Sequence, residues 1–110
     1  METKLERQRR WSREHYARNR DKVRANVKER QTRIQIDNRI LVAKIKDAPC
    51  VDCGGRFPSC AMDFDHRDPS QKLAGVGMMM GYKIETIQKE IDKCDLVCAN
   101  CHRIRTHMVP

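Results

Sequence analysis

The chain has 110 residues, a formal net charge of +8 and a pI near 9.5, so we expect at most one small domain with a tail or an arm. This excess of positive charge favours a polyanionic partner, most simply nucleic acid. The first residues lack the apolar run of a signal peptide, and no stretch is long enough to span a membrane. We therefore predict a cytoplasmic protein without membrane association, in which thiols stay reduced.

The positive charge lies in the first half of the chain. Residues 1–48 carry 15 Lys and Arg against 7 Asp and Glu, whereas residues 49–110 carry 8 of each. Residues 2–48 also contain no Gly or Pro and are rich in good helix formers. One long helix is expected, or two helices with a break between Arg30 and Asp37. The apolar stripe that indicates it consists of Tyr16, Val23, Val27, Ile34, Leu41 and Ile45.

We predict that this helical arm, residues 1–48, binds the DNA backbone. The simpler alternative is a solvated basic helix that mainly keeps the protein soluble. Trp11 and Tyr16 could stack on nucleic acid or anchor the helix to the rest of the chain. The densest stretch expected to face phosphates consists of Arg7, Arg9, Arg10, Arg13, Arg18, Arg20 and Arg24.

From Pro49 onward the composition changes, and residues 49–110 are predicted to form a second domain. The predicted elements are, in chain order, a zinc knuckle at Cys50–Gly55, a short strand over Ala61–His66, a mobile Gly- and Met-rich loop over Leu73–Tyr82, a helix over Ile84–Lys93, a short strand over Asp95–Val97 and a terminal helix over Asn100–Met108. Glycines after the second cysteine of the knuckle would let backbone amides turn back toward the thiolates. The Met-rich loop could also be read as a copper site, which soft ligands alone do not establish.

Two Cys-x-x-Cys pairs predict a tetrahedral four-thiolate zinc site, with Cys50, Cys53, Cys98 and Cys101 as ligands. A segment of 62 residues buries too little apolar surface to be secure alone, and a structural zinc contributes roughly 10–16 kcal/mol in small zinc peptides. A disulfide framework and covalent haem attachment at Cys98–His102 are alternatives that both need export. Cys60 and Cys94 are expected to be a half-buried pair of free thiols, either of which could replace a zinc ligand.

Asp65, His66 and His102 are left unexplained by the zinc site. A carboxylate and imidazoles beside a closed zinc site indicate a second, catalytic metal centre. The alternatives are a surface turn after a strand for Asp65 and His66, and an ordinary helix-start residue for His102.

Three segments carry a resemblance to a known family: Met62–Arg67, Glu90–Cys94 and Cys98–Arg103. Together with the two cysteine pairs they resemble the small zinc-containing, four-cysteine HNH endonucleases of phages and bacteria, over about residues 49–107. The resemblance implies a small α+β fold, a ββα-metal finger with a structural zinc site, here preceded by the long basic helix. The middle Asn of the family motif usually lies several residues before the second cysteine pair, where this chain reads Asp92-Lys93-Cys94-Asp95, and Asn100 lies inside the pair instead. A backbone carbonyl, Cys94 or Asp95 could orient the base instead.

The resemblance also implies a chemistry. His66 would be the general base that activates water, and Asp65 and His102 would hold Mg²⁺, Mn²⁺ or a similar ion. The expected function is hydrolysis of phosphodiester bonds in double-stranded DNA, with one nick per active site and 5′-phosphate and 3′-hydroxyl ends. Residues that could contact the substrate near the site are Arg67, Arg103 and Arg105.

Other readings stay open. A zinc-ribbon nucleic-acid-binding or regulatory module without chemistry is the main alternative, and an assembly factor of a larger phage or bacterial DNA-processing complex is a third. A monomer or weak dimer is expected, because a double-strand break would need two active sites or two successive events. His107 follows His102 by five residues, which is poor spacing for two ligands on one helix face, so an ordinary surface histidine is its simplest description.

Overall fold

The computed structural model describes residues 1–108 and shows a small α+β protein. Two compact units divide the chain, Met1–Arg33 and Ile34–Pro110. The elements are α1 (Lys4–Ile45), β1 (Met62–His66), α2 (Ile84–Ile91), β2 (Cys94–Cys98) and α3 (Ala99–Met108), with short 3₁₀ turns at Ser59–Ala61, Pro69–Gln71 and Val76–Met78. Within residues 1–108 no helix is both long and apolar enough to cross a membrane.

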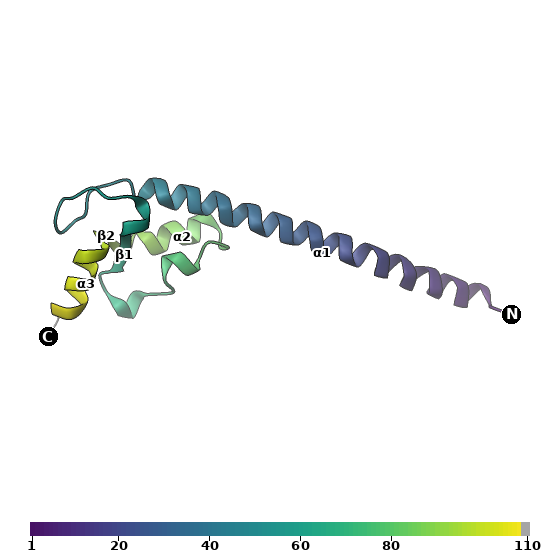
Figure 1. The fold of residues 1–110 in the computed structure, drawn as a ribbon. Coiled ribbons are helices and arrows are strands. Elements are labelled where there is room, and N and C mark those ends of the chain that lie inside the picture. Colours follow the sequence, from purple (N-terminus) through teal and green to yellow (C-terminus); the bar gives the residue numbers. More distant parts are fainter. Residues whose placement is uncertain (109–110) are drawn as a thin grey trace. The chain divides into compact units, whose positions relative to one another are not determined.

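Helix α1 is continuous, so the break considered between Arg30 and Asp37 does not occur (Figure 1). Its first turn is closed by a capping box: Thr3 Oγ1 accepts from the Glu6 amide at 3.1 Å, and the Thr3 amide donates to Glu6 Oε2 at 3.2 Å. No glycine or proline interrupts the segment before Pro49. Sequence propensity alone therefore accounts for the length of this helix.

Every residue of the first unit is exposed. The rings of Trp11 and His15 stack with their centroids 4.8 Å apart, yet Trp11 keeps 57% and Tyr16 keeps 69% of its surface exposed. Within this unit the predicted apolar stripe buries nothing. All faces of the helix in this unit, including its arginines, are therefore exposed to solvent.

The second unit begins with the last turns of α1, which pack through Asn38 and Val42. Asn38 Nδ2 donates to the carbonyls of Met80 and Tyr82, at 2.7 and 2.9 Å. Of the predicted stripe, Ile34 instead stays 40% exposed. Leu41 and Ile45 of the stripe are half-buried, whereas the two buried residues of this face, Asn38 and Val42, are not part of the stripe.

The segment expected to be a Gly- and Met-rich loop, Leu73–Tyr82, lies outside the strands and α-helices and contributes three residues to the core. Val76, Met79 and Met80 are buried, and Met79 is fully inaccessible. They cluster with Val42 and with Ile87 of α2. Long unbranched methionine side chains fill such irregular gaps well, so Met79 and Met80 serve packing within this loop.

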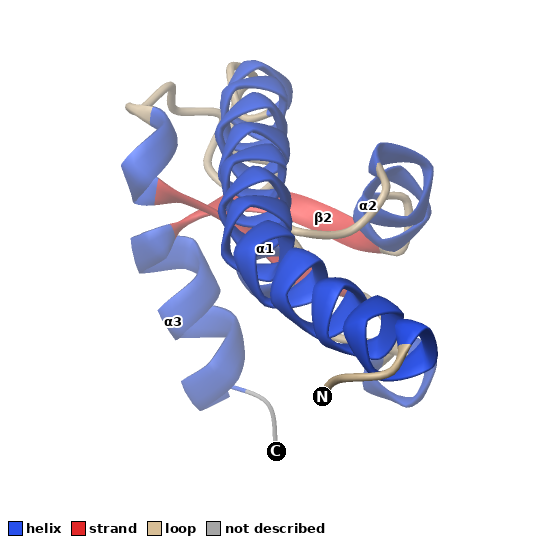
Figure 2. Ribbon diagram, turned by 90° about the vertical axis from the view of Figure 1, so that its right-hand side faces the viewer, coloured by secondary structure: helices blue, strands red, loops and turns tan. Residues whose placement is uncertain are grey.

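Strands β1 and β2 form a two-stranded antiparallel sheet, in which Met62 pairs with Cys98 and His66 with Cys94. Helix α2 precedes the Cys94 end of β2 and α3 follows its Cys98 end, so the two helices lie at opposite ends of the strands (Figure 2). A second small core, which includes Met62 and Val97, lies at the Cys98 end. The start of β1, the end of β2 and the start of α3 therefore meet at this second core.

Candidate functional site

The four paired cysteines come together and could hold a metal ion such as zinc. Their four sulfur atoms all lie within 4.8 Å of one another. Sulfurs at about 2.3 Å from a tetrahedral zinc are about 3.8 Å apart, and Cys53 Sγ and Cys98 Sγ are 4.0 Å apart. The donor set and its spacing fit zinc. The set consists of Cys50, Cys53, Cys98 and Cys101.

Backbone amides point at these sulfurs, as the glycines of the knuckle predict. Gly54 adopts a φ of +74°, which only glycine takes without strain, and the Gly55 amide donates to Cys53 Sγ at 3.4 Å. The Cys98 amide donates to Cys50 Sγ at 3.2 Å. Burial acts to raise the pKa of Cys50, but amide hydrogen bonds outweigh it and lower the pKa to about 6. This thiol is therefore prepared to bind as a thiolate.

Asp65 and His102 meet on one side of the sheet. His102 Nε2 lies 3.4 Å from Asp65 Oδ1, and its other nitrogen, Nδ1, lies 3.0 Å from Asp63 Oδ2. Asp63 and Asp65 share this side because alternate residues of a strand point the same way. His102 follows Cys101 directly, so the cysteine cluster fixes the start of α3 that carries it. The His102 side chain is 35% exposed, which leaves the group open to solvent.

Arg105 closes this side of the site with a set of ion pairs. Its Nε and Nη2 each lie 2.6 Å from a carboxylate oxygen of Asp52, and its Nη1 lies 3.0 Å from Asp65 Oδ2 and 3.1 Å from Asp95 Oδ2. These hydrogen bonds, those to Asp52 foremost, raise the pKa of Arg105 and lower that of Asp52. Most donors of this guanidinium are engaged by carboxylates, so few are left for a DNA phosphate.

His66 points to the other side of the sheet. Its Nε2 lies 2.8 Å from Glu90 Oε1 of α2, and 7% of the His66 side chain and 1% of the Glu90 side chain are exposed. No contact within residues 1–108 joins the His66 ring to Asp65 or to His102. The structure thus pairs the two proposed metal ligands on one side of the sheet, and the proposed base, although next to Asp65 along β1, lies on the other side.

The predicted DNA-contacting arginines differ in their freedom. Arg67 donates to the carbonyls of Asp92 and Cys94 and to Asp95, whereas Arg103 is exposed on α3. Within the first unit Arg10 pairs with Glu2 at 3.1 Å. All seven arginines predicted to face phosphates are exposed there: Arg7, Arg9, Arg10, Arg13, Arg18, Arg20 and Arg24.

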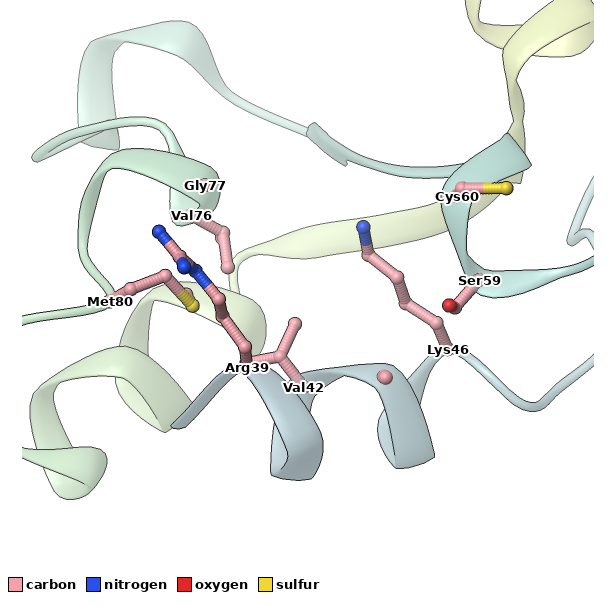
Figure 3. A pocket seen from close by; sticks show the side chains of 9 residues that line it. Arg39, Val42, Lys46, Ser59, Cys60, Val76, Gly77 and Met80 are labelled. Carbon is pink, nitrogen blue, oxygen red and sulfur yellow. The ribbon is translucent and has the colours of Figure 1, made fainter. Parts of the chain in front are cut away.

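A pocket of about 260 Å³ in the second unit adds two cations that the sequence analysis did not single out (Figure 3). Arg39 extends along it from α1 and Lys46 from the turn directly after α1, with Val42 between them and Met80 at one end. Neither cation has a carboxylate partner within residues 1–108, and Lys46 Nζ lies 5.5 Å from the centre of the Phe64 ring. Both are available to an anion.

Three acidic groups of the site were missed by sequence reasoning: Glu90, Asp63 and Asp52. The position of Asp63 two residues before Asp65 in a strand was a usable signal, because it predicts one shared side. Glu90 and Asp52 gave none, since each meets its partner only through the tertiary fold.

The two remaining cysteines do not form a pair. Cys60 is exposed and Cys94 is buried, and neither belongs to the metal-holding group. Burial and the nearby Glu90 carboxylate raise the pKa of Cys94 to about 11, so this thiol stays protonated and inert. His107 is exposed on α3, as expected of a surface histidine.

Comparison of the chain with protein-family models, with curated proteins and with solved structures finds no match.

Proposed function

We propose that the protein is a metal-dependent DNA endonuclease of the HNH type. The observation that carries the proposal is the 3.4 Å separation of Asp65 Oδ1 and His102 Nε2. Two ligand atoms at about 2.1 Å from one ion lie about 3.0–3.4 Å apart when the angle between them is octahedral to tetrahedral. The pair has the spacing of two ligands of a single ion, at the meeting point of two strands and a helix.

Asp63 supports this assignment as the partner of His102 Nδ1. A ligating histidine usually donates its other ring N–H to a carboxylate, which fixes the tautomer that leaves the ligating nitrogen free. Asp63 Oδ2 at 3.0 Å from Nδ1 is such a carboxylate. Two protein ligands suit Mg²⁺ or Mn²⁺, which keep water and substrate phosphate in their other positions. When bound, the ion would polarise the scissile phosphate and relieve charge on the departing oxygen.

The remaining parts of the proposal follow from the other groups. His66 would accept the proton of the attacking water, and a zinc ion on the four cysteines would be structural, holding β2 and the start of α3 in place. Double-stranded DNA would be bound through phosphates by the exposed arginines of the first unit, with Arg39 and Lys46 as further contacts. One site would make one nick.

The test is nicking of supercoiled plasmid by the zinc-loaded chain with Mg²⁺ or Mn²⁺. Asp65→Asn and His102→Ala should lower the cleavage rate by about 10²-fold or more while zinc content and DNA binding stay near wild type. His107→Ala, an exposed histidine on the same helix as His102, is the matched control and should cleave normally. Cleavage by the Asp65 and His102 variants at the wild-type rate would overturn the metal assignment.

A specific observation favours a second candidate, a zinc-ribbon nucleic-acid-binding module without chemistry. Arg105 neutralises Asp65 in the structure, and such an ion-pair network needs no metal ion to be stable. The same experiment separates the candidates: salt-sensitive DNA binding without cleavage by pure wild-type protein would support the module. Cleavage seen only within a larger complex would support an assembly role.

A further inference from the structure

Glu90 is a carboxylate in an unusual setting. Only 1% of its side chain is exposed, although it lies on the short helix α2. Three donors surround its two oxygens: the Leu73 amide and the His66 ring meet Oε1 at 2.9 and 2.8 Å, and Lys93 Nζ meets Oε2 at 2.9 Å. A buried carboxylate with three donors has its hydrogen-bonding capacity well used.

The charge on Glu90 decides which nitrogen of His66 carries a proton. Burial acts to raise the pKa of Glu90, but hydrogen bonds from Lys93, Leu73 and His66 outweigh it and lower the pKa to about 2. The group is therefore ionised at neutral pH, and an ionised carboxylate only accepts hydrogen bonds. At 2.8 Å from Oε1, His66 Nε2 must be the donor. In the neutral ring the lone pair then belongs to Nδ1.

The Nδ1 atom of His66 is not fully buried, although only 7% of the His66 side chain is exposed. Among the described residues no buried side-chain nitrogen or oxygen lacks a hydrogen-bond partner. The partner of the His66 ring is Glu90, at Nε2. Because Nδ1 has no such partner in the described part of the chain, it is not sealed from water.

We infer that Glu90 is the positioning residue of His66: it holds the imidazole with its proton on Nε2 and leaves Nδ1 as the basic nitrogen. Its importance for cleavage rests on the proposed nuclease function, in which Nδ1 accepts the proton of the attacking water. In this arrangement Glu90 takes the orienting task for which the sequence offered a backbone carbonyl, Cys94 or Asp95. Lys93 and the Leu73 amide hold Glu90 in turn, so α2 and the segment after β1 fix the ring together.

Long-range ¹H–¹⁵N NMR of the zinc-loaded chain reads the tautomer without any cleavage assay. With ¹⁵N-labelled histidine, the His66 signals are assigned by their loss in His66→Gln. We expect a protonated Nε2 and an unprotonated Nδ1 in the neutral ring of wild type. In Glu90→Gln the amide cannot accept from all three donors, so the single tautomer should give way to a mixture. Glu85→Gln, an exposed glutamate on the same helix, should keep the wild-type signals.

Kinetics then test the catalytic consequence. Glu90→Gln should lower kcat by at least about tenfold, with little change in KM. The upper limit is about 10⁴-fold, which is the whole contribution of a general base. A proton on Nδ1 in wild type, or a Glu90→Gln variant with unchanged tautomer and unchanged kcat, would overturn the inference. If wild type does not cleave DNA at all but shows the expected tautomer, the nuclease proposal fails and the positioning of His66 by Glu90 stands. The two failures are thereby distinguishable.

Discussion

At the scale of single residues, the carboxylates of the second unit differ by what surrounds them. Glu90 is buried with three donors and serves one imidazole, whereas Asp65 is partly exposed and lies between His102 and Arg105. A carboxylate that contacts one arginine and one histidine, and is partly open to solvent, can exchange partners when an ion binds. One that is sealed among donors cannot, so Glu90 suits a positioning task and Asp65 a ligand task.

The lowered pKa of Glu90 predicts a pH-dependent contribution to stability. Its pKa in the folded chain is about 2, below the ordinary value of 4.5, so the folded state favours the ionised form. The contribution is complete above the ordinary value and is lost as the pH falls toward about 2. Glu90→Gln should therefore be less stable than wild type by roughly 2–4 kcal/mol at neutral pH, and the gap should narrow in acid.

Chemical unfolding of both proteins across this pH range measures the gap. The difference between the two curves is the readout, because acid removes zinc from the same four thiols in each. Glu85→Gln, with its exposed carboxylate, should follow wild type throughout. A gap that stays constant from neutral pH to about pH 3 would show that the Glu90 charge adds nothing to stability.

The site residues that sequence reasoning found are those with local patterns. The four cysteines have metal-type spacing, and the structure groups them; Asp65 and His102 were found through a family resemblance and lie together. Glu90 lies 24 residues from His66 and its helix shows only ordinary amphipathic spacing. No local pattern marks a buried glutamate as the partner of a distant histidine, because that contact is created by the packing of α2 on the sheet.

At the scale of elements, both strands and all three helices of residues 1–108 were predicted within a few residues. Period-two alternation marks β1, and the absence of Gly and Pro marks α1. The segment Leu73–Tyr82 lies outside the strands and α-helices, as expected of a loop, and packs through Met79 and Met80. On α1 the two buried residues, Asn38 and Val42, were missed, and an apolar pattern cannot indicate the polar Asn38.

Asn38 predicts how firmly the end of α1 is fastened within the second unit. Asn38→Ala removes both donors to the Met80 and Tyr82 carbonyls and leaves them without their side-chain partner. The expected loss is about 1–3 kcal/mol of unfolding free energy, which a thermal or urea transition measures. Asn26→Ala makes the same chemical change at an exposed position of the same helix and should be neutral or slightly stabilising. Equal stability of the two variants would contradict the anchoring role of Asn38.

At the scale of the whole molecule, we expect the fold of the second unit to depend on metal binding by its cysteine cluster. Its two cores are small, and one of them contains Cys50 and Cys98 themselves. Removal of zinc by a strong chelator should therefore unfold this unit, with loss of its circular dichroism signal at raised temperature. Cys60→Ser changes an exposed cysteine outside the cluster. This variant should bind zinc like wild type and, when zinc-loaded, should unfold at the same temperature as wild type. An unchanged spectrum after complete zinc removal would refute the dependence.

The distribution of charge between the two halves predicts how DNA affinity responds to salt. Residues 1–30 carry 11 Lys and Arg against 5 Asp and Glu, and all of them are exposed. Each phosphate contact contributes about −0.9 to the slope of log affinity against log salt concentration on B-form DNA. A chain without residues 1–30 should thus show a clearly shallower slope, and its second unit, which begins at Ile34, should still fold and bind zinc.

A substitution series shows whether charge or mere length causes the change in slope. Replacing Arg9, Arg13 and Arg20 by Gln keeps good helix formers and removes three exposed cations. If all three contact phosphates, the slope should become shallower by about 2.7. Gln8→Ala together with Asn26→Ala alters exposed uncharged positions of the same helix and should leave the slope unchanged. Fluorescence anisotropy with a labelled duplex over a range of salt concentrations gives all four slopes. A deletion and a triple variant that both keep the wild-type slope would assign DNA affinity to the second unit, where Arg39 and Lys46 are the unpaired cations beside the pocket.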